Sequence, residues 1–106
     1  MIMDEYYRIL ISATSLEEAE MLVDMLLKEK LIAGGFIFEG TSHHWWKGKI
    51  DKEKYFNISA YTIPKNRDKI IEITRNNSKD ETPGIVFFKI DYANKDFLNW
   101  IDKNSK

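Results

Sequence analysis

The stretch that decides the fold is Ile32–Ile50, IAGGFIFEGTSHHWWKGKI, which contains both histidines and two of the three tryptophans of the chain. Its apolar and β-prone residues predict one strand over about Ile32–Phe38 and a second over Ser42–Lys47. Gly40 stands between them and predicts a break or bend, because glycine weakens the interior of a strand. The middle of the chain is therefore expected to hold a β-hairpin.

Glycines and charges mark further points around this hairpin. Gly34 and Gly35 indicate a bulge or the close approach of another part of the chain. Lys47-Gly48 predicts a tight turn or bulge before Lys49-Ile50. Residues 51–54, DKEK, are expected to form a solvated loop.

The segment before the hairpin predicts a strand followed by an amphipathic helix. Tyr6–Ala13 is apolar and β-rich, and Ser15 with Glu18 forms the S-x-x-E pattern of a capping box. The helix is expected to end near Glu29 or Lys30. Its buried stripe is expected to contain Ala19, Leu22, Val23 and Leu26, widened by Met21, Met25 and Leu27.

The second half repeats this alternation of strands and helices. A strand over Tyr55–Ile63 ends at Pro64, and an amphipathic helix is expected over Asn66–Asn76. Ile85–Ile90 is short and apolar, which predicts a central or well-covered strand. Asn94 is expected to cap a last helix whose buried face contains Phe97, Leu98, Trp100 and Ile101.

The order of these elements predicts an α+β fold, with residues 1–106 as a single domain. It matches the ferredoxin-like βαββαβ arrangement, with an extra hairpin strand and a C-terminal helix. Such a fold is an antiparallel sheet with both main helices on one face. The other face needs a cover, which in a chain this short we expect another subunit to supply.

Composition limits the classes of function. Sixteen basic residues against 17 acidic ones leave a net charge of −1, which argues against a nucleic-acid or anionic-membrane partner. Cysteine is absent, so the chain has no disulfide and no thiolate metal site. The acidic N-terminus and the lack of a long apolar run predict a cytoplasmic protein without a membrane span.

Several stretches together resemble the CutA family of divalent-cation tolerance proteins. They are SLEEAEMLVDMLLKEKLIAGGFI, the hairpin with Trp46-Lys-Gly-Lys49, the run Glu81-Thr-Pro-Gly-Ile85, and the closing Phe97-Leu-Asn-Trp100-Ile. The likeness spans nearly the whole chain in the same order. It implies a PII-like homotrimer involved in tolerance of copper and other divalent metals, with no enzymatic step. A small ligand or an unidentified protein partner is compatible with it.

The chain departs from the family pattern at several polar positions of the expected cleft. Gly34 stands where the family often has cysteine, Phe36 where it often has asparagine, and Tyr55 aligns with a glutamate. These replacements support an alternative, a structural or interaction trimer that has lost the family's ligand site.

The candidate metal ligands are His43, His44 and Glu39. Adjacent residues of a regular strand point to opposite faces, so the two imidazoles cannot both bind one ion. One imidazole with Glu39, or with a carboxylate from another subunit, is expected to suit Cu²⁺ or Zn²⁺. The competing interpretation is that both histidines are surface or interface residues of the hairpin.

The candidate cleft or interface residues are Trp45, Trp46, Lys47, Tyr55, Tyr61 and Glu81. The tryptophans are expected to divide between core and interface, with a stacking platform for a ring ligand as the alternative. Lys47 belongs to a small basic turn. We interpret this turn as a solvated one, with anion binding as the alternative. The two tyrosines are expected to line a cleft or to pack in an interface.

Enzymes and RNA-binding proteins share this fold class and form the third group of hypotheses. The sequence shows no nucleophile–base pair, no phosphate loop and no zinc-ligand spacing. The strand IVFFKI lacks the aromatic and basic signature of an RNA-recognition domain. We therefore expect a binding or regulatory protein without catalysis.

Overall fold

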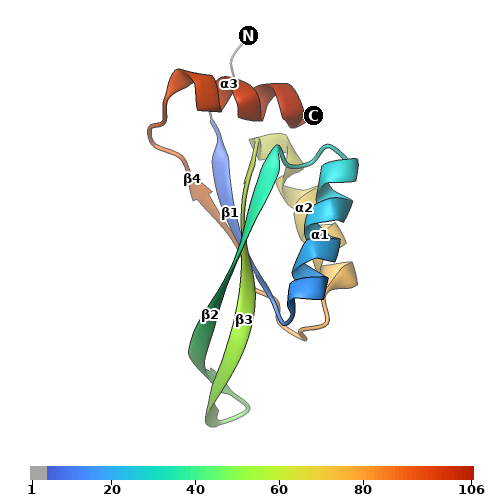
Figure 1. Cartoon of the computed structure of the whole chain (residues 1–106), viewed down its shortest axis with the longest axis vertical. Coiled ribbons are helices and arrows are strands. Elements are labelled where there is room, and N and C mark those ends of the chain that lie inside the picture. Colours follow the sequence, from blue (N-terminus) through green and yellow to red (C-terminus); the bar gives the residue numbers. More distant parts are fainter. Residues whose placement is uncertain (1–4) are drawn as a thin grey trace.

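The computed structural model describes residues 5–106; residues 1–4, on which the expected lack of an export signal partly rests, lie outside this range. Within the described range, three helices, a 3-10 turn and four strands follow the predicted order (Figure 1). They are β1 (Tyr7–Ala13), α1 (Leu16–Lys28), β2 (Gly34–Trp46), β3 (Lys49–Thr62), the turn Pro64–Asn66, α2 (Arg67–Asn77), β4 (Ile85–Lys89) and α3 (Lys95–Asn104). The α+β, ferredoxin-like fold class is confirmed.

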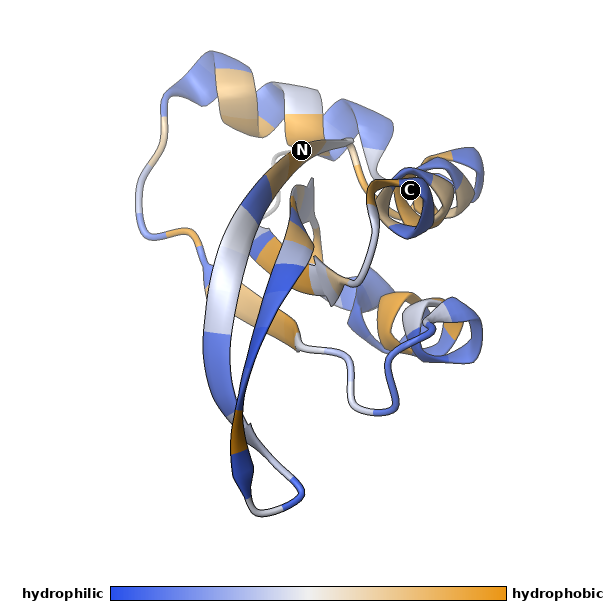
Figure 2. Cartoon of the chain, turned by 60° about the horizontal axis from the view of Figure 1, so that its bottom comes forward, coloured by the Kyte–Doolittle hydropathy of each residue, from blue (hydrophilic) through white to orange (hydrophobic). Residues whose placement is uncertain are grey.

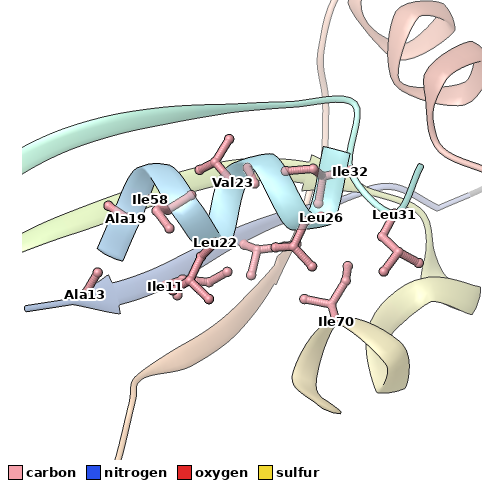
Figure 3. Close-up of a cluster of buried hydrophobic side chains, with 12 residues drawn as sticks. Ile11, Ala13, Ala19, Leu22, Val23, Leu26, Leu31, Ile32, Ile58 and Ile70 are labelled. Carbon is pink, nitrogen blue, oxygen red and sulfur yellow. The ribbon is translucent and has the colours of Figure 1, made fainter. Parts of the chain in front are cut away.

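The sheet has the strand order β2-β3-β1-β4, and each neighbouring pair is antiparallel. Figure 1 shows α1 and α2 side by side on one face, with α3 crossing one end. Ile9 lies opposite Ala60 and Phe87, and Ile11 opposite Ile58, so these residues share the face that the helices cover. The core between helices and sheet is formed by Ile9, Ile11, Ala13, Ala19, Leu22, Val23, Leu26, Leu31, Ile32, Ile58, Ala60 and Ile70 (Figure 3).

Ser15 caps helix α1 as predicted, but the Glu18 carboxylate accepts from the Thr14 N–H in place of the Ser15 N–H of a reciprocal capping box. The Ser15 hydroxyl accepts a hydrogen bond from the backbone N–H of Glu18 at 3.0 Å. The predicted stripe Ala19, Leu22, Val23 and Leu26 is buried, and Met25 is half-buried. Met21 and Leu27 are exposed, so the wider stripe was wrong at these two residues. The sheet contacts a narrow strip of the helix, and Figure 2 shows hydrophilic bands alternating with hydrophobic ones along the helices.

The hairpin is longer and more regular than expected. Gly40 does not interrupt β2, and the expected loop at residues 51–54 is part of β3. Pairing runs without an offset from Gly34 opposite Tyr61 to Trp46 opposite Lys49. Lys47 and Gly48 both have positive φ, as a two-residue type I′ turn requires. The continuous ladder overrides the local weakness of glycine, and the expected extra strand merges into β2 and β3.

Gly34 is a point of close approach and not a bulge. A Cβ atom built there would lie 2.7 Å from the Trp100 ring of α3, nearer than side chains pack. Glycine at this position therefore lets α3 lie against the end of the sheet.

Replacing Gly34 by alanine is expected to lower the free energy of unfolding by about 1–3 kcal/mol, because the added methyl group overpacks this contact. Chemical denaturation at fixed protein concentration measures the change. Gly40→Ala is the matched control within β2, since its Cβ would lie 3.8 Å from the Asn57 amide, an ordinary contact. Equal losses for the two variants would contradict the account of α3 packing.

Strand β4 is an edge strand, so the prediction of a central or well-covered strand was wrong for this chain. Ile85 and Phe87 pack on the core, whereas Val86 and Phe88 are exposed. They belong to the face of the sheet opposite α1 and α2, which we call the open face. Its apolar residues are Leu10, Phe36, Phe38, Val86 and Phe88. The run IVFFKI is apolar on both sides of β4. One side packs on the core, and the other side forms part of the open face.

Helix α3 covers one end of the open face. Phe97 meets Tyr61 edge-to-face at 4.9 Å between ring centroids, and Ile101 is buried beside Tyr6 and Ile63. Trp100, expected to be buried, is 40% exposed. Asn94 is the N-cap residue of α3 as predicted, but its side chain accepts no capping hydrogen bond from the helix. Between α3 and the connection that follows α2, Phe36, Phe38, Val86 and Phe88 expose their side chains on this face.

Candidate functional site

The far half of the β2–β3 hairpin carries a cluster of polar side chains on the side of the open face. The register places His44 directly opposite Asp51, and Ser42 directly opposite Glu53. Tyr55 follows two residues after Glu53 and so shares their side of the ladder. Figure 1 shows that this part of the hairpin projects beyond the helices.

His44, Asp51 and Glu53 bring potential metal ligands together. One ligand atom from each lies within 4.8 Å of the others. The His44 Nδ1 atom is 2.7 Å from the Ser42 hydroxyl. With the Nδ1–H donating to Ser42, the Nε2 lone pair is free for a ligand, an arrangement that metal-binding histidines commonly show. The three groups are partly or fully exposed and can be reached from solvent.

Tyr55 links this cluster to the segment between α2 and β4. Its ring stacks on His44 with 5.7 Å between centroids. Its hydroxyl donates toward Glu53 Oε2 at 3.4 Å and Asp80 Oδ2 at 3.3 Å. Partial burial and the negative charges of Asp80 and Glu53 raise the pKa of Tyr55 to about 12. The phenol therefore stays protonated at neutral pH and acts as a donor between two carboxylates.

Glu18 fixes the same segment from the other side. Its buried carboxylate accepts hydrogen bonds from the Thr14 N–H at 2.7 Å, the Thr14 hydroxyl at 2.8 Å and the Lys79 N–H at 2.6 Å. Burial raises the pKa of Glu18, but these bonds and the Lys79 charge outweigh it, so the net pKa is lowered. Glu18 is therefore an ionised carboxylate that binds the backbone of Lys79, the residue directly before Asp80.

Two adjoining polar cavities surround the cluster, with volumes of about 460 and 470 Å³. Both are lined by His44, Tyr55, Asp80 and Thr82. The first continues past Ser12, Ser42 and Asn57, and the second past Asp51, Glu53 and Trp46. The cluster thus opens into space large enough for an ion with its waters or a small polar ligand.

The structure divides the predicted metal ligands. His44 belongs to the cluster, but His43 lies opposite Lys52 and Glu39 opposite Phe56, on the other side of the same ladder. Within one chain, the described positions therefore do not bring His43 and Glu39 to His44. The carboxylates that lie near His44 in the described chain are Asp51 and Glu53.

The predicted cleft residues fall at two places. Trp45, Trp46, Tyr55 and Glu81 line the second cavity. Lys47 lies 5.6 Å from the Trp46 ring centre and 3.7 Å from Glu81, an exposed ion pair that contributes about 0–1 kcal/mol.

Trp45 and Tyr61 differ from these residues in their surroundings. Trp45 borders the second cavity but is 72% exposed, opposite the exposed Ile50. Tyr61 instead lines an apolar hollow of about 360 Å³ under α3, with Phe36, Phe97 and Trp100.

A signal for part of the site was present in the sequence. If Lys47-Gly48 is the two-residue turn, the register of the hairpin places His44 opposite Asp51. Treating residues 51–54 as a loop hid this pair. Glu18 and Asp80 had no such signal, because their meeting depends on the path of the chain after α2.

Comparison with known proteins finds relatives that match nearly the whole chain. The family model described as CutA1 divalent ion tolerance protein matches residues 7–104. A divalent-cation tolerance protein CutA from Archaeoglobus fulgidus is 36% identical over 95 residues, covering 90% of this chain and 93% of the relative. The corresponding protein of Pyrococcus horikoshii is 34% identical over 94 residues, covering 85% and 88%.

Solved structures agree with this relationship. The structure described as the periplasmic divalent cation tolerance protein CutA from A. fulgidus matches with a TM-score of 0.92 and covers 95% of this chain and 99% of its own. CutA1 from P. horikoshii matches with a TM-score of 0.89 at 27% identity, covering 94% and 98%. Across residues 5–106, no helix is both long and apolar enough to cross a membrane.

The family model and the two relatives together show that the chain belongs to the CutA1 divalent ion tolerance protein family.

Proposed function

We propose that this chain is a homotrimeric, non-catalytic protein that contributes to divalent-metal tolerance by binding the cation directly. The proposed ligands are His44, Asp51 and Glu53, and Cu²⁺ is the cation that we expect to bind most tightly. The observation that carries the proposal is the convergence of one imidazole and two carboxylates within 4.8 Å on a regular hairpin. The names of the relatives, which describe divalent-cation tolerance, support it.

The chemistry of the donor set favours copper or zinc over calcium or magnesium. Imidazole suits Zn²⁺ and Cu²⁺, whereas Ca²⁺ and Mg²⁺ prefer oxygen ligands alone. For a given nitrogen and oxygen site, affinity rises along the first-row metals to Cu²⁺ and falls at Zn²⁺. Ser42 would orient the His44 ring through Nδ1.

His44→Ala is expected to weaken Cu²⁺ and Zn²⁺ binding by about 10–100-fold, because it removes the nitrogen ligand. Calorimetric titration against a competing chelator measures the change.

His43→Ala is the matched control, since the neighbouring imidazole faces away from the cluster. Glu39→Gln tests the ligand set that was first expected from the sequence. The His43→Ala and Glu39→Gln variants are both predicted to bind the cation with the affinity of the wild type. Equal losses in the His43 and His44 variants would indicate general surface binding and overturn the proposed site.

The homotrimer is proposed from the open face. Phe36, Phe38, Val86 and Phe88 expose large apolar side chains on one continuous face of the sheet. Exposed apolar patches of this kind mark interaction surfaces. A closed trimer of the PII-like type would bury them, in keeping with a regulatory role.

A second candidate function is a structural or interaction trimer that no longer binds a ligand. The replacements at Gly34, Phe36 and Tyr55 favour it. The titration of the wild type separates the two: saturable, stoichiometric binding at micromolar affinity excludes the second candidate. The cytoplasmic location also remains a prediction, to be tested by cell fractionation, because the A. fulgidus relative is described as periplasmic.

A further inference from the structure

The connection between α2 and β4 reaches the candidate metal site through one side chain. Asp80 turns one oxygen, Oδ1, to its own loop, where it accepts a hydrogen bond from the Thr82 N–H at 3.1 Å. Its other oxygen, Oδ2, faces the hairpin and lies 3.3 Å from the Tyr55 hydroxyl. That same hydroxyl is 3.4 Å from Glu53 Oε2. Two carboxylates from separate parts of the chain therefore converge on one phenol.

Glu18 determines where this connection runs. Its carboxylate is 1% exposed and uses both oxygens, Oε1 for Thr14 and Oε2 for the Lys79 N–H. Lys79 directly precedes Asp80, so the bond at Lys79 fixes the backbone next to Asp80. Segment 78–82 is also held by the Ser78 hydroxyl at the end of α2, by the Thr82 N–H bond to Asp80 and by a long ion pair from Glu81. Bonds between Gly84 and Ser12 fix the chain just after it.

We propose that Asp80 supplies a further carboxylate to a divalent cation bound by His44, Asp51 and Glu53, and that Glu18 is the residue that positions it. This inference rests on the function proposed above. The three hairpin groups leave at least one coordination position open for a four-coordinate or larger site. The Tyr55 hydroxyl hydrogen lies between the negative charges of Glu53 and Asp80. A bound cation would neutralise these two charges in its place.

Cation binding would then be coupled to the order of segment 78–82. Because Glu18 lies in the first turn of α1, the effect would extend to the start of that helix. Binding would connect three elements that are distant in sequence: the hairpin, the α2–β4 connection and the N-terminus of α1. A cation that binds the ordered segment better than the disordered one would shift the population toward the ordered state.

A double-mutant cycle with Asp80→Asn and Glu18→Gln tests this, with Zn²⁺ as the titrated ion. Each single variant is expected to weaken Zn²⁺ binding, Asp80→Asn by about 10-fold and Glu18→Gln by about 3–10-fold. Glu18→Gln should have no further effect in the Asp80→Asn background, because it acts through Asp80. Glu17→Gln is the control, an exposed carboxylate in the same helical turn.

Backbone hydrogen exchange gives a second measurement that needs no change at Glu18. Adding Zn²⁺ to the wild type is expected to slow exchange of the amides in segment 78–82, and His44→Ala should abolish this slowing. This arm decides the matter if Glu18→Gln does not fold.

The outcomes separate the two proposals. A wild type that binds no Zn²⁺ overturns the proposed function and this inference together. Normal Zn²⁺ affinity in Asp80→Asn, combined with a loss in His44→Ala, overturns this inference alone. Additive losses in the double variant would show that Glu18 supports the fold in general and does not position Asp80.

Discussion

Glu18→Ala is expected to lower the free energy of unfolding by about 3 kcal/mol. The substitution leaves the backbone N–H groups of Thr14 and Lys79 without the acceptor that they now share. Both bonds are part-buried and end on a charged carboxylate, and a hydrogen bond to a charged group contributes about 1.5 kcal/mol or more, so the two together give about 3 kcal/mol. Chemical denaturation at fixed protein concentration measures the loss, since an oligomer's stability depends on concentration.

The same variant predicts a pH dependence. The folded-state pKa of Glu18 lies below its ordinary value of 4.5, so the unfolded state binds this proton more readily. The stabilisation is therefore complete well above pH 4.5 and is lost as the pH falls through the folded-state pKa. We expect the difference between wild type and Glu18→Ala to be constant near neutral pH and to shrink in acid.

Glu17→Ala provides the comparison for both experiments. Glu17 is exposed in the same helical turn and is expected to change stability by at most about 0.5 kcal/mol. A loss for Glu18→Ala no larger than this would contradict the anchoring role of its carboxylate.

Phe36→Asp is expected to dissociate the proposed homotrimer into monomers. Phe36 is 72% exposed in the single chain, where a surface substitution would have little effect on folding. If the open face is buried between subunits, each copy of the variant would bury a carboxylate without a partner, which costs several kcal/mol. The average mass by light scattering should fall from about three chains to one.

Leu27→Asp is the matched control, an exposed apolar residue on the outer side of α1. It is expected to leave the mass unchanged. A wild type that is monomeric at micromolar concentration, or a Phe36→Asp variant with the wild-type mass, would contradict burial of the open face.

The features that could be predicted from the sequence are those that local patterns determine. The cap at Ser15 and the stripe from Ala19 to Leu26 follow from spacing within one helix. Gly34 was expected to mark a bulge or a close contact, and the structure selects the contact, with Trp100. That choice depends on how α3 packs, which the local pattern does not contain.

The errors arise where pairing between strands outweighs local preference. Gly40 is a weak strand residue, yet the ladder on both sides carries β2 through it. The charged run at 51–54 is typical of loops, but a long hairpin that projects from the sheet can carry charged side chains in strands. A strand that projects into solvent is stabilised by backbone hydrogen bonds to its partner strand, so its side chains can be charged.

The site shows the same division between local and long-range information. His44 was among the expected ligands, and the turn at Lys47-Gly48 was enough to place Asp51 opposite it. The contribution of segment 78–82 depends on the bond between Glu18 and the Lys79 N–H, 61 residues apart in the chain. No periodicity or spacing in the sequence carries that information.

The central claim is that a divalent cation binds between His44, Asp51 and Glu53, and a crystal structure with Cu²⁺ tests it most directly. The anomalous difference map at the copper edge is predicted to show a peak about 2.0–2.2 Å from the His44 Nε2 atom and from an Asp51 or Glu53 carboxylate oxygen. A peak at His43 or Glu39 instead, or none on the hairpin at saturating Cu²⁺, would contradict the account.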